Sequence, residues 1–160
     1  MLGKTQKRLL LRWMGFWPPF FGAGIRVTHV AKDLRHVAVR LDLRWWNANY
    51  VGTAFGGSLF AMTDPYYMLM LIEHLGTEFV VWDKAASIRY RRPGRTAVTA
   101  EFTLTEERLA EIRATAATRD KFDALFTVVI KDKKGDTIAE VEKTLSIQKK
   151  ARTAKRASLS

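Results

Sequence analysis

Residues 56–75 of this chain read GGSLFAMTDPYYMLMLIEHL, and this stretch decides which folds the rest of the sequence allows. Leu, Met, Phe and Tyr recur on every side of a helix drawn through it, which is typical of a helix buried in a protein core. Gly76 follows as a C-cap residue. A membrane span is excluded, because Asp64 would lie in mid-segment at a cost of about 2.5–3.5 kcal/mol and Pro65 follows it.

The segments on both sides of this helix alternate apolar and polar residues, which is typical of half-buried strands. The expected strands cover residues 24–30, 37–44, 79–92, 98–104, 122–131 and 137–148. A tight hairpin turn joins the last two, and residues 106–117 have the spacing of a peripheral helix. Antiparallel strands around one apolar helix predict an α+β fold, in which a curved sheet wraps around that central helix.

The length of 160 residues and a composition that is 48% hydrophobic and 27% charged predict one globular domain. We expect this domain to cover residues 18–148. An amphipathic helix over residues 1–17 precedes it, and a basic, disordered tail over residues 149–160 follows.

The net charge of +11 comes mainly from the two ends of the chain. Residues 1–12 and 149–160 carry nine Lys or Arg side chains and no acid, whereas residues 13–148 hold 18 bases against 16 acids. A nucleic-acid-binding domain more often spreads its charge over a folded face, so the sequence argues against nucleic acid as a partner.

Residues 1–17 have the pattern of a short basic amphipathic helix, which Pro18 and Pro19 are expected to end. The basic side is formed by Lys4, Arg8 and Arg12. The apolar side is formed by Leu9, Leu10, Trp13, Met14 and Trp17. Three interpretations stay open: packing on the protein's own body, lying on a membrane surface, and targeting to an organelle.

The chain has no cysteine, which excludes disulfides, thiolate metal sites and cysteine nucleophiles. This fits a reducing compartment, and we expect a cytoplasmic protein that touches membranes at most peripherally. Serine-hydrolase, phosphate-loop, dinucleotide and zinc-hydrolase motifs are absent. His29 and His36 have no ligand-type neighbours at metal spacing, so no metal or other cofactor is expected.

The stretch from Asn47 to Asp64 gathers the residues best suited to chemistry. A helix that begins at Gly56 and Gly57 leaves unpaired N–H groups and its positive dipole end toward a ligand oxygen, where they can stabilise an oxyanion. Asp64 is suited to act as general base or nucleophile. The same residues allow a structural alternative, in which Asp64 is the N-cap and Pro65 the first residue of a helix.

The residues Asn49-x-x-Gly52-Thr53-x-Phe55-Gly56-Gly57, followed after six residues by Asp64, resemble a signature of hot-dog-fold acyl-CoA thioesterases of the phenylacetic-acid-pathway group. That signature reads Asn-x-x-Gly-(Thr)-x-His-Gly-Gly…Asp. Several other pieces are similar to the DUF4442 family, a branch of the same superfamily. They include Trp45-Trp46-Asn47, Thr63-Asp64-Pro65, Trp82-Asp83-Lys84-Ala85 and Arg92-Pro93-Gly94. The likeness spans about residues 18–148.

The resemblance implies a hot-dog fold that hydrolyses an acyl thioester, carried by coenzyme A or an acyl carrier. It implies that Asp64 is the base or nucleophile and that the amides of Gly56 and Gly57 polarise the carbonyl. Asn49 would help to hold the carbonyl or the water, and Asp83 takes the place of a hydroxyl that assists the water. Sites of this group lie between subunits, which implies a homodimer or a dimer of dimers.

Two residues depart from the signature. Phe55 stands where the signature has His and removes a polar group from the mouth of the site. Asp83 brings a second carboxylate toward Asp64, which would raise one pKa by repulsion. Either change leaves open a protein that binds acyl-CoA without turnover, and the missing His argues against a dehydratase. The arginines near the Pro93-Gly94 turn suit coenzyme A phosphates or form a solvated strand end; they are Arg89, Arg91, Arg92 and Arg95.

Overall fold

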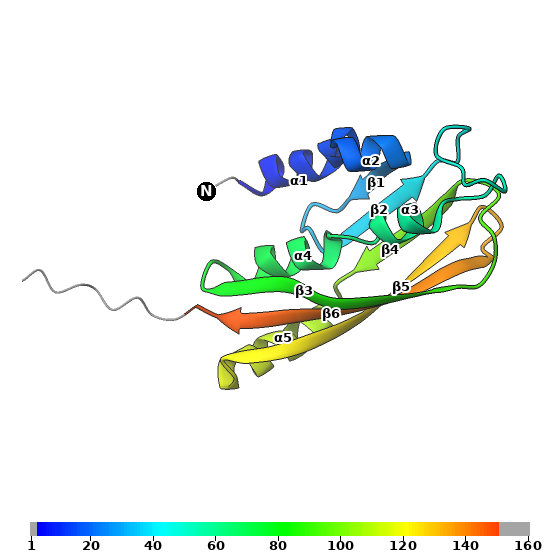
Figure 1. Cartoon of the computed structure of the whole chain (residues 1–160). Coiled ribbons are helices and arrows are strands. Elements are labelled where there is room, and N and C mark those ends of the chain that lie inside the picture. Colours follow the sequence, from blue (N-terminus) through cyan, green and yellow to red (C-terminus); the bar gives the residue numbers. More distant parts are fainter. Residues whose placement is uncertain (1–2, 151–160) are drawn as a thin grey trace, which may run out of the picture.

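Six strands form one antiparallel sheet in the order β1-β2-β4-β5-β6-β3 (Figure 1). The structure is a computed structural model that describes residues 3–150. The strands are β1 (Ile25–Val30), β2 (His36–Leu41), β3 (Phe79–Tyr90), β4 (Val98–Thr103), β5 (Lys121–Asp132) and β6 (Thr137–Lys149). All six strands predicted from the alternating pattern are therefore present, with small shifts at their ends.

Within residues 3–150, helices lie near the N-terminus, in the middle of the chain and before β5. They are α1 (Lys4–Trp13), the 3-10 helix η1 (Met14–Phe16), α2 (Pro18–Ala23), α3 (Gly56–Ala61), α4 (Tyr66–Leu75) and α5 (Glu106–Thr118). The helix α4 is the central apolar helix, and it packs on the sheet. Its Tyr67 ring stacks on Phe126 of β5 at 4.2 Å between ring centroids and meets Phe102 of β4 edge-on at 5.4 Å. The predicted α+β architecture is confirmed.

The single helix expected over residues 56–75 is wrong in one respect, because it is two helices with a break at Met62–Pro65. Pro65 has no N–H and so cannot continue the hydrogen-bond ladder of α3. The alternative with Asp64 as a helix cap is also wrong. Pro65 holds the N-cap position of α4, no side chain caps that helix, and the Asp64 carboxylate lies against Lys143 of β6 instead.

Two expectations about the chain ends also need correction. Pro18 and Pro19 do not end the N-terminal helix, because α1 already ends at Trp13. They start α2 instead, where the first turn tolerates proline. Lys149, which the sequence assigned to the tail, is the last residue of β6 and pairs with Phe79. The rest of the predicted disordered tail, from residue 151 onward, lies outside the described residues.

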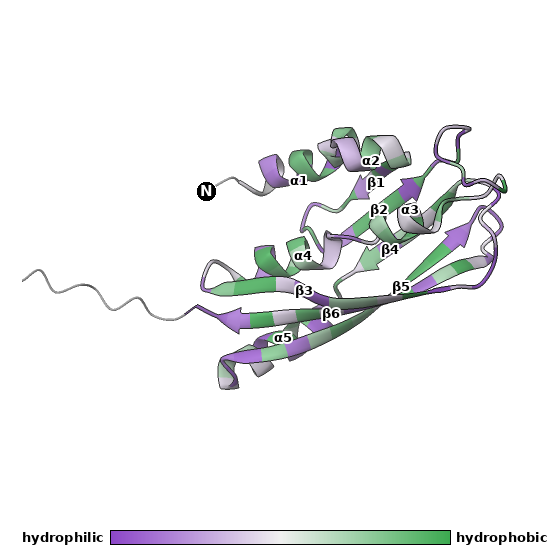
Figure 2. Cartoon of the chain, viewed as in Figure 1, coloured by the Kyte–Doolittle hydropathy of each residue, from purple (hydrophilic) through white to green (hydrophobic). Residues whose placement is uncertain are grey.

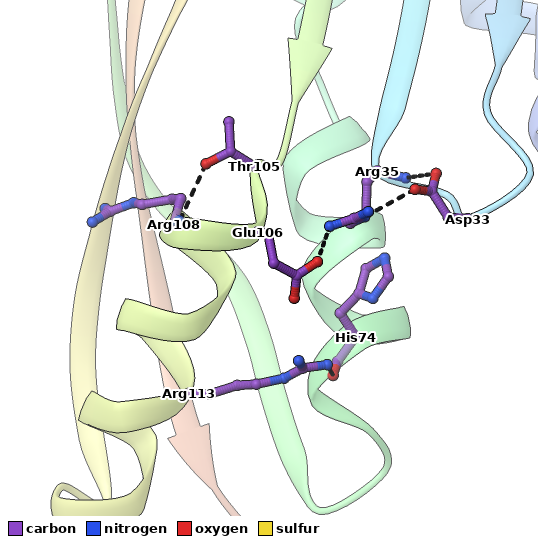
Figure 3. Close-up of polar contacts among 7 residues, drawn as sticks. All are labelled: Asp33, Arg35, His74, Thr105, Glu106, Arg108 and Arg113. Atoms are coloured by element: carbon purple, nitrogen blue, oxygen red, sulfur yellow. Dashed lines mark hydrogen bonds and ion pairs between the residues drawn. The ribbon is translucent and has the colours of Figure 1, made fainter.

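Polar contacts fasten α5 to the rest of the fold (Figure 3). The Thr105 hydroxyl accepts a hydrogen bond from the N–H of Arg108 at 3.2 Å and so caps the helix. Glu106 pairs with Arg35 from the β1–β2 loop. Arg113 donates to the carbonyl oxygen of His74 in α4 at 3.1 Å. The predicted peripheral helix thus ties the hairpin and the central helix together.

A buried asparagine fixes the start of the loop that carries the candidate site. The Asn47 side chain donates to the carbonyl oxygens of Ala23 (2.9 Å) and Asp42 (2.8 Å) and accepts from the N–H of Arg44 (2.7 Å). Gly24 passes beside it with a φ of 72°, and a Cβ there would lie 2.3 Å from the Asn47 Nδ2 atom. Asn47 is therefore a structural brace, and Gly24 leaves the space that it needs.

We predict that Gly24→Ala destabilises the protein by about 2–4 kcal/mol, because the left-handed backbone disfavours a Cβ and the brace must move. Urea denaturation followed by circular dichroism measures this change. Gly22→Ala is the matched control, since Gly22 lies in α2, two residues before the C-cap Gly24, with nothing within 4 Å of its added Cβ. Equal stabilities of the two variants would contradict the assigned role of Gly24.

Candidate active site

Gly56 and Gly57 open α3, with Phe55 as the extended N-cap residue. The first N–H groups of a helix have no intrahelical acceptor and so remain for a ligand. Aromatic rings cover both glycines. A Cβ on Gly56 would lie 2.8 Å from the Tyr90 hydroxyl, and one on Gly57 would lie 2.5 Å from the Phe55 ring. A larger residue at either position would therefore have to displace the Tyr90 or the Phe55 side chain, at the turn where the N–H groups are available.

A cavity of about 570 Å³ lies at this helix start, between the loop before α3 and the chain after β3. It brings together most of the residues predicted for carbonyl and substrate binding. These are Asn49, Phe55, Gly56, Gly57, Arg91 and Arg92. Arg95 is exposed and lies outside its lining, so the structure does not join that predicted residue to the others.

Asn49 mainly holds its own loop in shape. Its carboxamide oxygen accepts from the N–H groups of Val51 (3.1 Å) and Thr53 (2.9 Å), and its amino group donates to the Thr53 hydroxyl at 2.8 Å. An amide nitrogen has two N–H donors, so one is left for a ligand. The geometry therefore assigns Asn49 first to the loop and leaves it limited capacity to hold a carbonyl or water.

The two arginines at this cavity form ion pairs with acidic residues of β6 and of the turn that precedes it. Arg91 lies 2.8 Å from a carboxylate oxygen of Glu140, and Arg92 lies 2.9 Å from one of Asp136. The hydrogen bond from Arg91 holds the pKa of Glu140 below its usual value. Both pairs are partly exposed, and surface pairs of this kind contribute little, so an anionic ligand can replace the acids.

A second cavity, of about 340 Å³, contains the carboxylates and borders Gly57 as well. The ammonium of Lys143 in β6 lies 3.0 Å from Asp64 and 2.9 Å from Asp83, and it donates to the carbonyl oxygen of Thr63 at 3.3 Å. The Lys143 side chain is only 4% exposed, whereas those of Asp64 and Asp83 are 60% and 27% exposed. Its three donors thus meet three acceptors in a nearly dry position.

The pKa of Asp83 is raised, and burial of its carboxyl group is the largest cause. The repulsion from Asp64 raises this pKa further, while the nearby Lys143 lowers it. Asp83 therefore binds a proton more readily than an exposed aspartate, next to an Asp64 carboxylate that is open to solvent.

Asp83 lies on the inward face of β3 with buried Val81, and the strand becomes irregular directly after it, at Lys84. Asp83 pairs with Leu145, but Ala85 pairs with Thr144, so Lys84 is one extra residue in a bulge. The simple alternation expected for residues 79–92 placed Asp83 and Ala85 on the same face, and this expectation is wrong. Asp83 faces inward opposite buried Leu145, and after the bulge Ala86 instead of Ala85 takes the next inward position, opposite Lys143.

Sequence reasoning missed Lys143. It lies in the inward row of β6, whose other members are buried: Ala139, Val141, Leu145 and Ile147. A lysine in an otherwise apolar row was the signal, because a charge is buried only with partners. The alternating pattern alone could not show which carboxylates would meet it.

Histidine and carboxylate side chains do not form a metal site in residues 3–150. Among the described residues, no three or more His, Asp or Glu side chains converge closely enough to hold an ion.

We predict that Lys143→Met costs about 2–3 kcal/mol of stability at neutral pH, less than for a fully buried pair because Asp64 is well exposed. The pKa of Asp83 should rise further, since the lysine that lowers it is gone. A carboxyl whose folded-state pKa is raised stabilises most at acidic pH and loses this contribution as pH rises through that pKa. The stability lost through Lys143→Met should therefore be smaller at acidic pH than at neutral pH.

Urea denaturation from pH 4 to pH 8, with carboxyl NMR titration of Asp83, checks this prediction. The matched control is Lys84→Met, which removes a neighbouring lysine whose pair with Asp123 is exposed. A loss of stability that does not depend on pH, or an unchanged titration of Asp83, would show that Lys143 does not stabilise the protein through its contacts with the carboxylates.

Comparisons with solved structures show which known proteins have a similar fold. A probable thioesterase of Pseudomonas aeruginosa is similar with a TM-score of 0.77 and 20% identity, over 93% of this chain and 97% of that one. A thioesterase of Haemophilus influenzae has a TM-score of 0.65 and 14% identity, over 93% and 92%. The PaaI protein from the E. coli phenylacetic acid degradation operon has a TM-score of 0.60 and 14% identity, over 93% and 97%.

These likenesses confirm the predicted hot-dog fold. No curated protein sequence is significantly similar to the chain. The family model described as a domain of unknown function, DUF4442, matches residues 6–147. The chain therefore belongs to the DUF4442 family.

Proposed function

We propose that the protein hydrolyses acyl thioesters, with acyl-CoA as the substrate. One observation carries this proposal: the Asp64 carboxylate and Gly57, in the first turn of α3, border the same cavity. Acyl transfer to water needs a base to activate the water and unpaired N–H donors to stabilise the oxyanion, both at the same cavity. The thioesterase names of similar folds support the same reaction.

In the proposed reaction, Asp64 takes a proton from a water molecule, whose oxygen attacks the thioester carbonyl carbon. The N–H groups of Gly56 and Gly57 stabilise the oxyanion that forms. The tetrahedral intermediate then collapses, the C–S bond breaks, and the proton held by Asp64 passes to the departing sulfur. The products are a carboxylic acid and a free thiol, and Asp64 is restored.

The two cavities suggest where the parts of the substrate lie. Gly57 borders both, so a thioester at the start of α3 can extend its two halves in different directions. The larger cavity has Arg91 and Arg92 at its wall, and guanidinium groups suit the phosphates of coenzyme A. We therefore propose the coenzyme A half for that cavity.

A homodimer or a dimer of dimers is part of this proposal. The strand β3 lies at the end of the sheet, next to β6 alone, and residues 82–87 within it are exposed. A long edge strand offers unpaired N–H and carbonyl groups that natural proteins normally cover. Pairing of β3 with a second copy would cover them and bring Asp83 near the subunit boundary.

The second candidate function is binding of acyl-CoA without hydrolysis. Two observations favour it: Phe55 lines the mouth where the thioesterase signature has His, and Lys143 already occupies one oxygen of Asp64. The ammonium competes with water for that carboxylate. Such a protein would bind acyl-CoA tightly and release no thiol.

We predict that Asp64→Asn lowers kcat for acyl-CoA hydrolysis by about 10²–10⁴-fold, since an amide cannot take the proton from water. A thiol reagent with acyl-CoAs of short to long chains gives the rate. The matched control is Asp33→Asn, which removes an exposed carboxylate in the β1–β2 loop and should leave the rate unchanged.

Two results would decide against hydrolysis by Asp64. An Asp64→Asn variant as active as the wild type would remove the base from its role. Binding of acyl-CoA by calorimetry, with no thiol release at any chain length, would instead establish the binding protein.

A further inference from the structure

The apolar side of α1 faces outward. Leu11, which does not belong to this side, is buried, and Gly15 in η1 packs on β1, where an added Cβ would lie 3.3 Å from Arg26. Leu9, Leu10 and Trp13 are each more than half exposed. The N-terminal segment therefore packs on the protein's own body through Leu11 and Met14, but these three side chains stay uncovered.

The exposed apolar surface continues through η1 and α2. We call it the aromatic face, and it consists of Leu9, Leu10, Trp13, Phe16, Trp17 and Phe21, all more than half exposed. The three helices lie along β1, at the end of the sheet opposite β3 (Figure 1). Figure 2 shows apolar residues recurring along them. An apolar area of this kind marks a site of interaction.

An apolar groove of about 670 Å³ adjoins this face, between α1 and α4. Leu10, Trp13 and Trp17 belong to both the aromatic face and the groove, whereas Phe16 and Phe21 lie outside its lining. Leu69 and Ile72 of α4 form part of the opposite wall. The surface to be covered is therefore partly convex and partly concave.

The chain segment that carries this face has charges of one sign only. The first 32 residues contain no acid and six bases: Lys4, Lys7, Arg8, Arg12, Arg26 and Lys32. Lys7 and Arg26 pair with Glu73 and Asp42 from other parts of the fold. Arg12 is exposed and Arg8 half-exposed, on the flank of the apolar side of α1. This flank complements a negatively charged surface.

We propose that the aromatic face docks on an anionic lipid surface. Apolar and aromatic side chains on one side of a helix, with cations at its flank, are what an interfacial helix needs. Trp sits well at the level of lipid headgroups. No helix among residues 3–150 is long and apolar enough to cross a bilayer.

Lipid fits this surface better than a protein helix does. A helix laid in the groove would leave Phe16 and Phe21 uncovered, whereas mobile acyl chains can fill the groove and surround the convex rings. Anionic headgroups also match the acid-free segment. The proposal does not depend on thioester hydrolysis, although a lipid surface would place a source of long acyl chains beside the groove.

Co-sedimentation of the full chain with vesicles tests the proposal. Wild type should bind vesicles of phosphatidylcholine with phosphatidylglycerol, and bind phosphatidylcholine alone more weakly. The triple variant Trp13→Ser, Phe16→Ser, Phe21→Ser should bind the anionic vesicles about tenfold or more weakly, from lost apolar burial. Leu125→Ser is the matched control, because Leu125 is equally exposed but lies on β5, which β2 and β4 separate from β1.

Separate variants test how far charge contributes to the binding. Arg12→Glu should weaken binding to the anionic vesicles and leave binding to neutral ones unchanged, while Lys133→Glu in the β5–β6 turn should change neither. Circular dichroism confirms that each variant is folded.

Three results would overturn the proposal. They are a wild type that binds no anionic vesicle, a triple variant that binds as well as wild type, and an equal loss with Leu125→Ser. A smaller mass of the triple variant in light scattering, without vesicle binding by wild type, would assign the face to contact between copies of the chain.

Discussion

The ammonium of Lys143 is the constraint on which the candidate site depends. A buried cation must be paired, and here the partners come from two separate elements, the α3–α4 break and β3. Satisfying the lysine therefore fixes the end of α3 against the sheet. The same contact orients Asp64 and gathers both carboxylates in one cavity. Positioning of the proposed base thus follows from the cost of leaving a charge unpaired.

The fold follows well from the sequence because its signals are periodic and repeated. The alternation in the six strands and the apolar stretch at residues 66–75 each involve many residues, so single exceptions do not change the result. Boundaries were less predictable. Pro65 permits either a kinked helix or a new one, and local pattern alone does not decide. The Pro18-Pro19 pair likewise serves equally well as an end or a beginning.

The site could be predicted only in part, for a different reason. Gly57 and Asp64 are close in sequence, so their shared cavity could be anticipated from spacing. Lys143 is distant along the chain, and its meeting with Asp64 depends on the order of the strands in the sheet. For Asn49, the residue type suggested an amide that binds the ligand. In the structure, its side chain mainly forms hydrogen bonds within its own loop.

The extra residue at Lys84 has a consequence for how relatives of this chain are compared. Beyond it, the inward positions of β3 are Ala86, Ile88 and Tyr90, which pair with Lys143, Val141 and Ala139. A relative whose strand lacks the bulge is one residue shorter and yet keeps every side chain on the same face. An ungapped alignment through this strand would then match interior residues with exterior ones, on one side of Lys84 or the other. Correct comparison of the carboxylate at Asp83 therefore requires a gap placed at that position.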